Sequence, residues 1–352
     1  MKKGNKSEEW QRETGLVIGI DLGDKWSSVC VRGADGEVRQ EDRVRTNTMD
    51  VSRLFSRVEQ SLVVMEVGTH SPWASRLLES LGHAVIVANP RRLKLISASD
   101  GKSDRVDARL LAELGQCMPR LLQPVRHRSA EAHTDLLVIR ARARLVEVRT
   151  RLWNSLRSMA KSLGHRLPRK VKEEHLDPWP ALRPLWETVG ELTDRIRDYD
   201  RRIEALVRDK YPAAIRLQQV AGVGPIIALT FVLTIEDALR FRKSRHVGSY
   251  AGLRPRQRDS GESQPQLRVT RAGDRYLRAM LVQGAQYILG RYAPDTDLRR
   301  WGLQLAARGG KNAKKRAVVA VARKLAVLLH KLWVSQEPYQ PLRNSALTAV
   351  VS

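Results

Sequence analysis

Cysteines, aromatic residues and long apolar stretches are scarce in this sequence. Its 352 residues include two cysteines, Cys30 and Cys117, and 5% Phe, Trp and Tyr. Two isolated cysteines match no zinc-ligand spacing and require no disulfide, which favours a reducing cytoplasm. No apolar run reaches the roughly 18 residues that a membrane-spanning helix needs. The polar residues at the start also differ from a secretory signal. The sequence therefore predicts a cytoplasmic protein with no membrane partner.

Negative charge is also in short supply. The chain has 38 acidic residues against 63 Lys and Arg, which gives a formal net charge of +25. An excess of this size on a folded protein points to a polyanionic partner, and arginine suits two-point contacts with phosphate. DNA or RNA is the most direct candidate, and such a partner predicts association with the nucleoid. The alternative explanation of the charge is a basic surface that binds no nucleic acid.

The N-terminal third alternates between strand and helix patterns after a polar tail over residues 1–15. Apolar runs bounded by turn residues predict strands, and apolar side chains at three- and four-residue steps predict helices. This order predicts a mixed α/β domain over 16–123, antiparallel at first and βαβ later. The expected strands are 16–22, 27–32, 38–46, 62–67 and 83–88, and the expected helices are 50–60 and 71–81.

The rest of the chain reads as mainly helical. Two long amphipathic patterns, over 128–164 and about 180–206, predict a helical connector over 124–210, either a packed pair or a coiled-coil seam between copies in a dimer or tetramer. In the domain over 211–340, the Gly-rich turn Val220–Pro225 is typical of a helix-hairpin-helix element. An apolar helix through Ile226, Ala228, Leu229 and Val232 is expected to follow it. Further helices are expected over 274–289 and 315–333. The chain after Pro338, with a tail over 341–352, is expected to be loose.

Four carboxylates stand at the ends of the predicted N-terminal elements, and we refer to them as the acidic tetrad. Asp21 and Glu66 end apolar strand patterns, while Asp104 and Asp107 begin a helix pattern behind the potential N-cap Ser103. A spacing of three residues places the last two on one helix face. Acidic residues in a first helical turn also suit the helix dipole, so simple capping is the alternative.

The order of the acidic tetrad favours a ribonuclease-H-type fold. In that fold the first strand and a later strand lie side by side, and a following helix carries the last carboxylates over their ends. Carboxylates attached to core elements are costly unless a positive charge pairs with them. Two Mg²⁺ ions held about 4 Å apart would supply that charge and serve phosphoryl transfer. The sequence therefore predicts a two-magnesium site formed by Asp21, Glu66, Asp104 and Asp107.

The segment around Asp21 also fits a second class of protein. Ile18–Gly23 is similar to the first phosphate loop of sugar kinases and actin-like ATPases. Those proteins need a second Asp-Gly-Gly loop and a Gly-Gly adenosine motif. Neither is found in a suitable context, because Gly309-Gly310 begins a Lys-rich loop. A kinase also leaves the charge of +25 unexplained.

A second group of candidate residues surrounds Ser260, which precedes Gly261 in a Gly-, Pro- and Arg-rich segment over 253–275. A serine hydroxyl attacks phosphorus only when it is activated and cations stabilise the developing charge. Ser263 is the competing nucleophile, and a loop that merely contacts nucleic acid is the alternative. The basic residues expected to contact nucleic acid are Arg140, Arg144, Arg151, Arg254, Arg256, Arg258, Arg268, Arg271, Lys311, Lys314 and Lys315.

Two sets of motifs in this order resemble the DEDD-type insertion-sequence transposases, the "one-ten" family. The first set consists of Ile18–Asp21, Met65–Thr69, Val87–Pro90 and Lys102–Arg109. The second consists of Val220–Pro225, Tyr250–Arg256, Asp259–Gly261 and Thr270–Arg278. Together they cover roughly residues 16–335.

The resemblance implies a RuvC-like domain over 16–123, a helical connector and a serine-bearing transposase domain over 211–340. It also implies that the acidic tetrad binds metal, that Ser260 is the nucleophile that joins DNA, and that a noncoding bridge RNA of the element pairs with donor and target DNA. Two other functions stay open. One is a RuvC-like nuclease that cuts structured DNA without serine chemistry, and the other is a non-catalytic nucleic-acid-binding protein.

Overall fold

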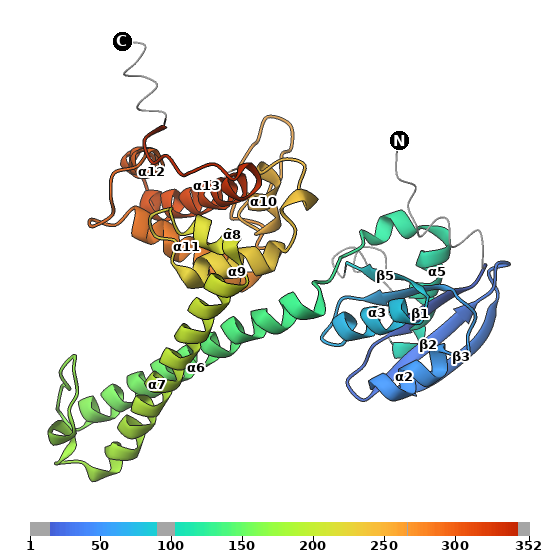
Figure 1. Ribbon diagram of the computed structural model, residues 1–352, viewed down its shortest axis with the longest axis horizontal. Coiled ribbons are helices and arrows are strands. Elements are labelled where there is room, and N and C mark those ends of the chain that lie inside the picture. Colours follow the sequence, from blue (N-terminus) through green and yellow to red (C-terminus); the bar gives the residue numbers. More distant parts are fainter. Residues whose placement is uncertain (1–14, 90–102, 266, 344–352) are drawn as a thin grey trace. The chain divides into compact units, whose positions relative to one another are not determined.

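The structure is a computed structural model that describes residues 15–89, 103–265 and 267–343. Its contacts divide the chain into two compact units, one up to Ala130 and one from Glu131 onward. Figure 1 follows the chain from the sheet of the first unit to the helices of the second. Each unit is described by itself.

A five-stranded sheet in the order β3-β2-β1-β4-β5 forms the centre of the first unit. β1 pairs antiparallel with β2, which pairs antiparallel with β3, while β1, β4 and β5 are parallel. This mixed sheet is compatible with the ribonuclease-H-type fold that the sequence predicts. The strands are β1 (Val17–Asp21), β2 (Trp26–Arg32), β3 (Val38–Arg45), β4 (Leu62–Glu66) and β5 (Ala84–Ala88).

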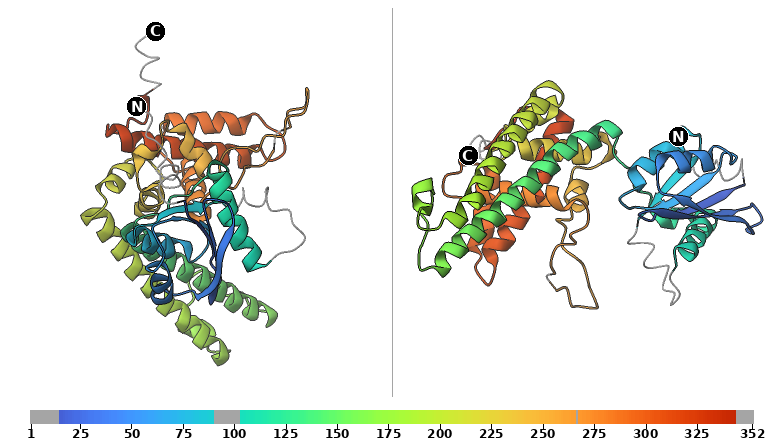
Figure 2. Two further views of the ribbon diagram at one scale, coloured as in Figure 1. Left: turned by 90° about the vertical axis from the view of Figure 1, so that its right-hand side faces the viewer. Right: turned by 90° about the horizontal axis from the view of Figure 1, so that it is seen from below.

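Helices cover both faces of this sheet (Figures 1 and 2). On one face, α2 (Thr48–Phe55) and α3 (Ser71–Ser80) pack on the buried side chains of Ile18 and Ile20. On the other face, α5 (Asp104–Cys117) packs on Val17, Leu62 and Val64. The strict alternation along β1 explains this layering, because successive side chains of a strand point to opposite faces.

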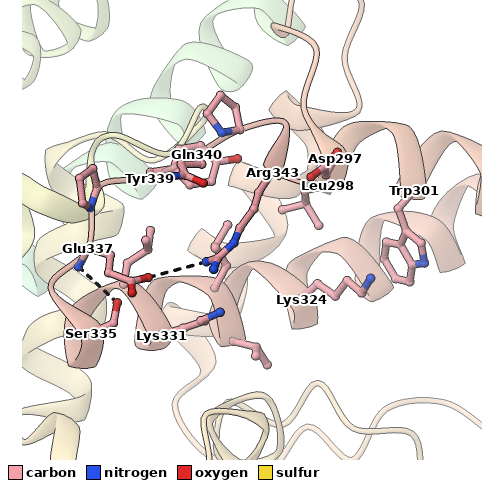
Figure 3. Close-up of a pocket in the computed structure, with 15 residues that line it drawn as sticks. Asp297, Leu298, Trp301, Lys324, Lys331, Ser335, Glu337, Tyr339, Gln340 and Arg343 are labelled. Atoms are coloured by element: carbon pink, nitrogen blue, oxygen red, sulfur yellow. Dashed lines mark hydrogen bonds and ion pairs between the residues drawn. The ribbon is translucent and has the colours of Figure 1, made fainter. Parts of the chain in front are cut away.

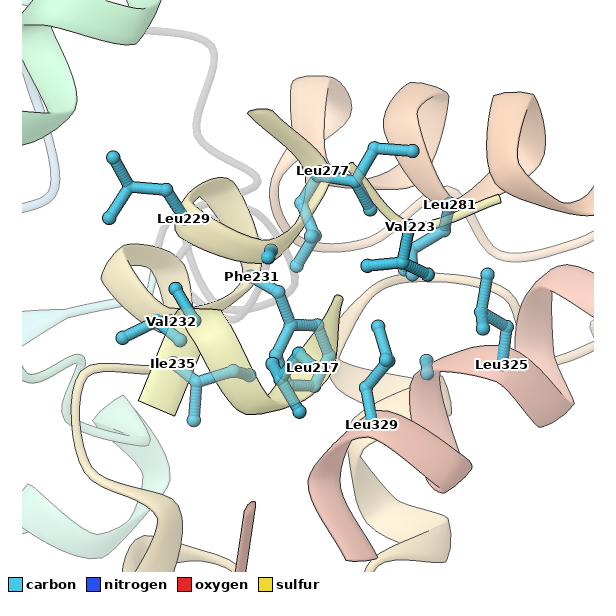
Figure 4. Packing of buried hydrophobic residues seen from close by; sticks show 14 of the residues in the cluster. Leu217, Val223, Leu229, Phe231, Val232, Ile235, Leu277, Leu281, Leu325 and Leu329 are labelled. Atoms are coloured by element: carbon cyan, nitrogen blue, oxygen red, sulfur yellow. The ribbon is translucent and has the colours of Figure 1, made fainter. Parts of the chain in front are cut away.

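The second unit is helical and has its own apolar core. Figure 4 shows Phe231 of α9 between side chains of α8, α11 and α13, and it is fully buried. The helices are α6 (Ala130–Ser162), α7 (Arg183–Asp209), α8 (Pro212–Leu217), α9 (Pro225–Ile235), α10 (Arg245–Tyr250), α11 (Arg275–Ile288), α12 (Asp297–Ala307) and α13 (Ala313–Ser335). Short 3₁₀ turns lie at Pro119–Leu122, Glu173–Leu176, Pro180–Leu182 and Ala238–Arg240.

The two long helices α6 and α7 correspond to the predicted connector. Their apolar side chains join the main core near Ile139 and Ile203 and form a second cluster around Leu156 and Leu182. An ion pair between Arg142 and Asp200 also links the two helices. The predicted ranges 128–164 and 180–206 agree with these helices to within three residues at each end.

The expectation of a loose chain after Pro338 is wrong as far as Pro341. The Tyr339 N–H donates to Gln219 Oε1 at 2.8 Å, and the Asp297 N–H donates to the Pro341 carbonyl at 2.8 Å. Figure 3 shows this segment running over α12 and α13, where it helps to line a cavity of about 410 Å³. Long-range backbone hydrogen bonds of this kind leave no periodic signal in a sequence.

Two helices, α10 and α12, were not among the predicted elements. In α12, Leu298 and Trp301 pack on the core but stay partly exposed, and Gly302 is the buried residue. Within the described ranges, no helix combines the length and apolarity that a membrane crossing requires.

Candidate active site

Asp21 and Glu66 end neighbouring parallel strands of the first unit. The last paired residues of β1 and β4 are Ile20 and Met65, so each carboxylate follows directly at the same edge of the sheet. Ile20 and Met65 point to the α2 and α3 face. Asp21 and Glu66 therefore belong to the opposite face, the one that α5 covers.

Helix α5 begins at that same edge. A Cβ on Gly19 would lie 2.0 Å from the Ala108 carbonyl, so the backbones of β1 and α5 touch at this point. Farther along the helix, a Cβ on Gly115 would lie 3.2 Å from the Val17 side chain. The helix thus runs antiparallel to β1, and its first turn lies toward the strand ends that carry Asp21 and Glu66.

Asp104 and Asp107 occupy this first turn. Ser103 caps the helix as predicted, because its Oγ accepts from the Val106 N–H at 3.3 Å. The two carboxylates precede the buried residues Ala108 and Leu111 by four positions each, so they share the helical stripe that faces the sheet. All four members of the acidic tetrad therefore lie toward one edge and one face of the sheet.

The acidic tetrad offers oxygen ligands, the kind that Mg²⁺ prefers. Asp21, Glu66 and Asp107 are half-buried, and Asp104 is exposed. In the described ranges, however, no three His, Cys, Asp or Glu side chains come close enough together to hold a metal ion. The backbone positions of the four residues thus fit a metal site. That their side chains bind a metal ion stays a prediction.

Glu41 is a residue near the acidic tetrad that the sequence reasoning missed. It lies on β3 and binds two arginines of α5, with Arg105 Nε at 2.6 Å and Arg109 Nη2 at 2.8 Å from Oε2. The hydrogen bonds from Arg109 and then Arg105 lower the pKa of Glu41 to about 2. Glu41 thereby anchors the N-terminal half of α5, the part of the helix that carries Asp104 and Asp107.

Ser260 lies in the second unit, in a tight turn over 260–263 that we name the serine turn. The Ser260 N–H donates to the Ser263 carbonyl at 3.2 Å, and the Ser263 N–H donates back at 3.0 Å. Gly261 has φ +53°, a conformation that glycine adopts without strain. The turn projects from the helices on an extended segment (Figure 2). Both serines are exposed.

The segment that carries the serine turn is held at its base by a short antiparallel pairing. The Arg256 N–H donates to the Arg268 carbonyl at 2.9 Å, and the Thr270 N–H donates to the Arg254 carbonyl at 2.9 Å. Arg254, Arg256, Arg258, Arg268 and Arg271 are all exposed. Of these, Arg254 bonds to Gln257.

The predicted nucleic-acid contacts on the helices have different surroundings. Arg140 forms an ion pair with Asp274 and lies 4.7 Å from the centroid of the Tyr276 ring, so its charge is engaged inside the unit. Arg144 and Arg151 share the exposed carboxylate of Glu147 on the surface of α6. Lys311, Lys314 and Lys315 are exposed at the start of α13.

The predicted helix-hairpin-helix region consists of α8, a turn and α9. Gly222 in this turn has φ +81°, and a Cβ on it would lie 2.9 Å from the Gly284 carbonyl of α11. Gly224 at the start of α9 has open space around its Cβ position. The turn borders a cavity of about 850 Å³ that also contacts Arg142 and Arg149 of α6.

Profiles of known families match both halves of the chain. The profile described as "Transposase IS116/IS110/IS902 family" matches residues 214–299. The profile of the DEDD transposases of IS110 type, described as "Transposase", matches residues 18–164. The first match includes Ser260, and the second includes all four residues of the acidic tetrad.

Individual relatives extend over nearly the whole chain. A probable family 20 transposase of Pseudomonas aeruginosa is 31% identical over 340 residues, which are 92% of this chain and 98% of the relative. The transposase for insertion sequence element IS1111A of Coxiella burnetii is 28% identical over 341 residues, 92% of this chain and 91% of the relative. A pilin gene-inverting protein of Moraxella bovis is 26% identical over 289 residues, 79% of this chain and 81% of the relative.

Proposed function

The chain belongs to the IS116/IS110/IS902 family of transposases, and we propose that it recombines DNA with a metal-binding acidic tetrad and a serine nucleophile. The DNA strands concerned are the ends of its own insertion sequence and a target. The observation that carries this proposal is the first turn of α5, which directs Asp104 and Asp107 toward the ends of β1 and β4.

Asp21, Glu66, Asp104 and Asp107 would hold two Mg²⁺ ions. Bound there, Mg²⁺ would supply positive charge for the phosphate oxygens and lower the pKa of an attacking hydroxyl. The tetrad residues themselves orient the site, because each is fixed to a strand or helix of a packed core. Glu41 keeps the N-terminal half of α5 in place through Arg105 and Arg109.

Ser260 is the proposed nucleophile. Its Oγ forms a bond to the phosphorus of a DNA strand while the bond from phosphorus to one sugar oxygen breaks. The serine gives up its proton, and the departing sugar oxygen gains one. The resulting phosphodiester between Ser260 and DNA keeps the energy of the broken bond, so an incoming sugar hydroxyl can reverse the step and join a new strand. The exposed guanidinium groups of Arg254, Arg256 and Arg258 suit stabilisation of the extra negative charge.

In this proposal a noncoding bridge RNA of the element selects the DNA, because it pairs with both donor and target. The charge of +25 and the exposed lysines at the start of α13 support binding of a structured polyanion. RNA binding should weaken steeply as salt rises. Binding that is absent, or unchanged between low and moderate salt, would remove RNA guidance from the proposal.

A homo-oligomer is the proposed working form. Leu137, Val148 and Met159 of α6 are between 44% and 55% exposed, on a helix long enough for a coiled-coil seam. A Val148→Glu variant should shift the mass in solution toward the monomer while leaving the helix content unchanged. An unchanged mass would contradict a seam at this position.

The direct test of the serine chemistry is to trap the reaction on labelled DNA, denature the mixture, and map the modified peptide. We expect a DNA-linked Ser260 that disappears in Ser260→Ala and persists in Ser263→Ala. Ser263 is the matched control, since it lies in the same turn and is also exposed. Strand cleavage without any protein-linked DNA would favour the RuvC-like nuclease, and an adduct on another residue would refute the role of Ser260.

A further inference from the structure

Trp26 is an exposed aromatic residue beside the acidic tetrad. It begins β2, and 39% of its surface is exposed to solvent. Asp21 is paired in register with Ser28 of the same strand. Because β1 and β2 are antiparallel, Trp26 lies two residues beyond that pair, at the edge where β1 and its carboxylate end.

Trp26 also lies on the face of the sheet that carries the acidic tetrad. Its neighbours Ser27 and Val29 are buried, and Val29 packs in the core under α2 and α3. Cys30 lies four positions after Trp26, on the same face of the strand, and packs against Ala108 and Ala112 of α5. Since side chains alternate along a strand, Trp26 shares the α5 face with Asp21.

Two arginines on the adjacent strand contact the ring. Arg45 is the register partner of Trp26, and Arg43 that of Ser28. Their guanidinium carbons lie 5.5 Å and 5.1 Å from the centroid of the indole. Both side chains are exposed, and in the described part of the chain neither forms an ion pair with an acidic residue.

The backbone under these three side chains is held firmly. The Thr46 N–H donates to the Lys25 carbonyl at 3.0 Å, and the hydroxyls of Ser27 and Thr46 are 2.7 Å apart. The preceding turn is equally tight, since a Cβ on Gly23 would lie 2.3 Å from the Trp26 carbonyl. The indole is therefore carried on a part of the sheet edge whose backbone is fixed.

We propose that Trp26, Arg43 and Arg45 form a platform that binds an unpaired DNA strand as it leads into the acidic tetrad. One base stacks on the indole, and the two guanidinium groups contact the adjoining phosphates. Stacking on an aromatic ring suits any base, and arginine can contact both a ring and a phosphate. A flat aromatic with two cations beside it fits a single strand better than a duplex, whose bases are already stacked. This inference rests on the proposed function, because it identifies the strand as the one processed at the tetrad.

The test is photo-crosslinking with a short single-stranded DNA that carries one 5-iodo-2′-deoxyuridine. The full chain is irradiated with this probe in EDTA, so that no catalysis is needed, and the modified peptide is mapped. We expect an adduct at Trp26. Trp26→Leu should lower the yield of crosslinked DNA in the peptide that contains residue 26 about tenfold, whereas Trp26→Phe should retain most DNA binding.

The arginines have a matched control on the same strand. Arg39 is exposed on β3 near its other end and pairs with Asp35. Arg43→Gln combined with Arg45→Gln should lower the crosslink yield about threefold and reduce its salt dependence, while Arg39→Gln should change neither. An equal effect of Arg39→Gln would mean that general positive charge, and not the platform, binds the strand.

The results separate this inference from the proposed function. Absence of a Trp26 adduct in protein that still forms the Ser260–DNA linkage would overturn the platform alone. An adduct obtained only with the matching 5-iodouridine RNA would also overturn it, because the bound strand would then be RNA. A Trp26 adduct in EDTA supports the platform whether or not Ser260 proves to be the nucleophile.

Discussion

The edge of the sheet that carries the acidic tetrad and the serine turn are built in opposite ways. The tetrad residues continue packed elements, and their neighbours Ile20 and Met65 are fully buried. Ser260 is exposed in a turn where a Cβ on Gly261 would meet nothing within 4 Å. A metal site needs ligands fixed to rigid elements, whereas a residue that carries a DNA strand needs room. The two halves of the proposed chemistry therefore have different structural requirements.

The largest expected effect comes from neutralising one carboxylate of the tetrad. Asp107→Asn should lower strand exchange in Mg²⁺ by roughly a thousandfold, because the charge that holds the metal is lost from an otherwise intact site. Thermal unfolding should change little. The rate is measured with labelled DNA under single-turnover conditions.

Glu113→Gln is the control for this variant, since Glu113 lies on the same helix and pairs only loosely with Arg32, at 3.8 Å. It should keep normal activity. A normal rate for Asp107→Asn would remove that residue from the tetrad.

A pair of glycine substitutions compares the rigidity of the two regions. Gly19→Ala places a Cβ 2.0 Å from the Ala108 carbonyl, where backbone must move, so we expect a loss of about 3 kcal/mol in unfolding free energy. In Gly261→Ala the new Cβ meets no neighbour, but alanine must adopt φ +53°. We expect this to lower the unfolding free energy by about 1 kcal/mol, with the strain confined to the turn. Chemical denaturation of the full chain measures both. Equal losses would contradict the contrast between the regions.

Removal of the anchor on α5 should have an intermediate effect. Glu41→Gln cannot hold Arg105 and Arg109 by charge, so Asp104 and Asp107 lose part of their support. We expect strand exchange to fall about tenfold, as for other residues that orient metal ligands. Raising the Mg²⁺ concentration should restore part of the rate, which a general loss of folding would not allow. A rate unaffected by Glu41→Gln would exclude the positioning role.

The smallest expected effect is the pH dependence of this anchor. The pKa of Glu41 is lowered from 4.5 to about 2 by Arg109 and Arg105. Because the folded pKa lies below the unfolded one, the stabilisation is complete above about pH 4.5 and is lost as the pH falls toward 2. The difference in melting temperature between the natural chain and Glu41→Gln should therefore shrink across this window. If this difference in melting temperature stayed constant across the window, its cause would not be the ionisation of Glu41.

The strands and long helices follow from local patterns, and so does the placement of the tetrad. Apolar runs that stop at Asp21 and Glu66 mark the ends of β1 and β4, and Ser103 marks the start of α5. The role of Glu41 had no such signal, because its partner Arg105 is 64 residues away in sequence. The contacts of Arg43 and Arg45 with the Trp26 ring had no local signal either, because they form only through strand pairing. Local sequence thus indicates elements, while contacts across the sheet decide what surrounds a site.

The most direct test of the central claim, that the tetrad binds the metal, is anomalous scattering from crystals of the protein with DNA and Mn²⁺, a common substitute for Mg²⁺. We expect anomalous peaks bounded by the carboxylates of Asp21 and Glu66 and by those of Asp104 and Asp107. The same peaks should be absent from crystals of Asp21→Asn. Manganese bound only elsewhere, or identical peaks in Asp21→Asn, would contradict the account.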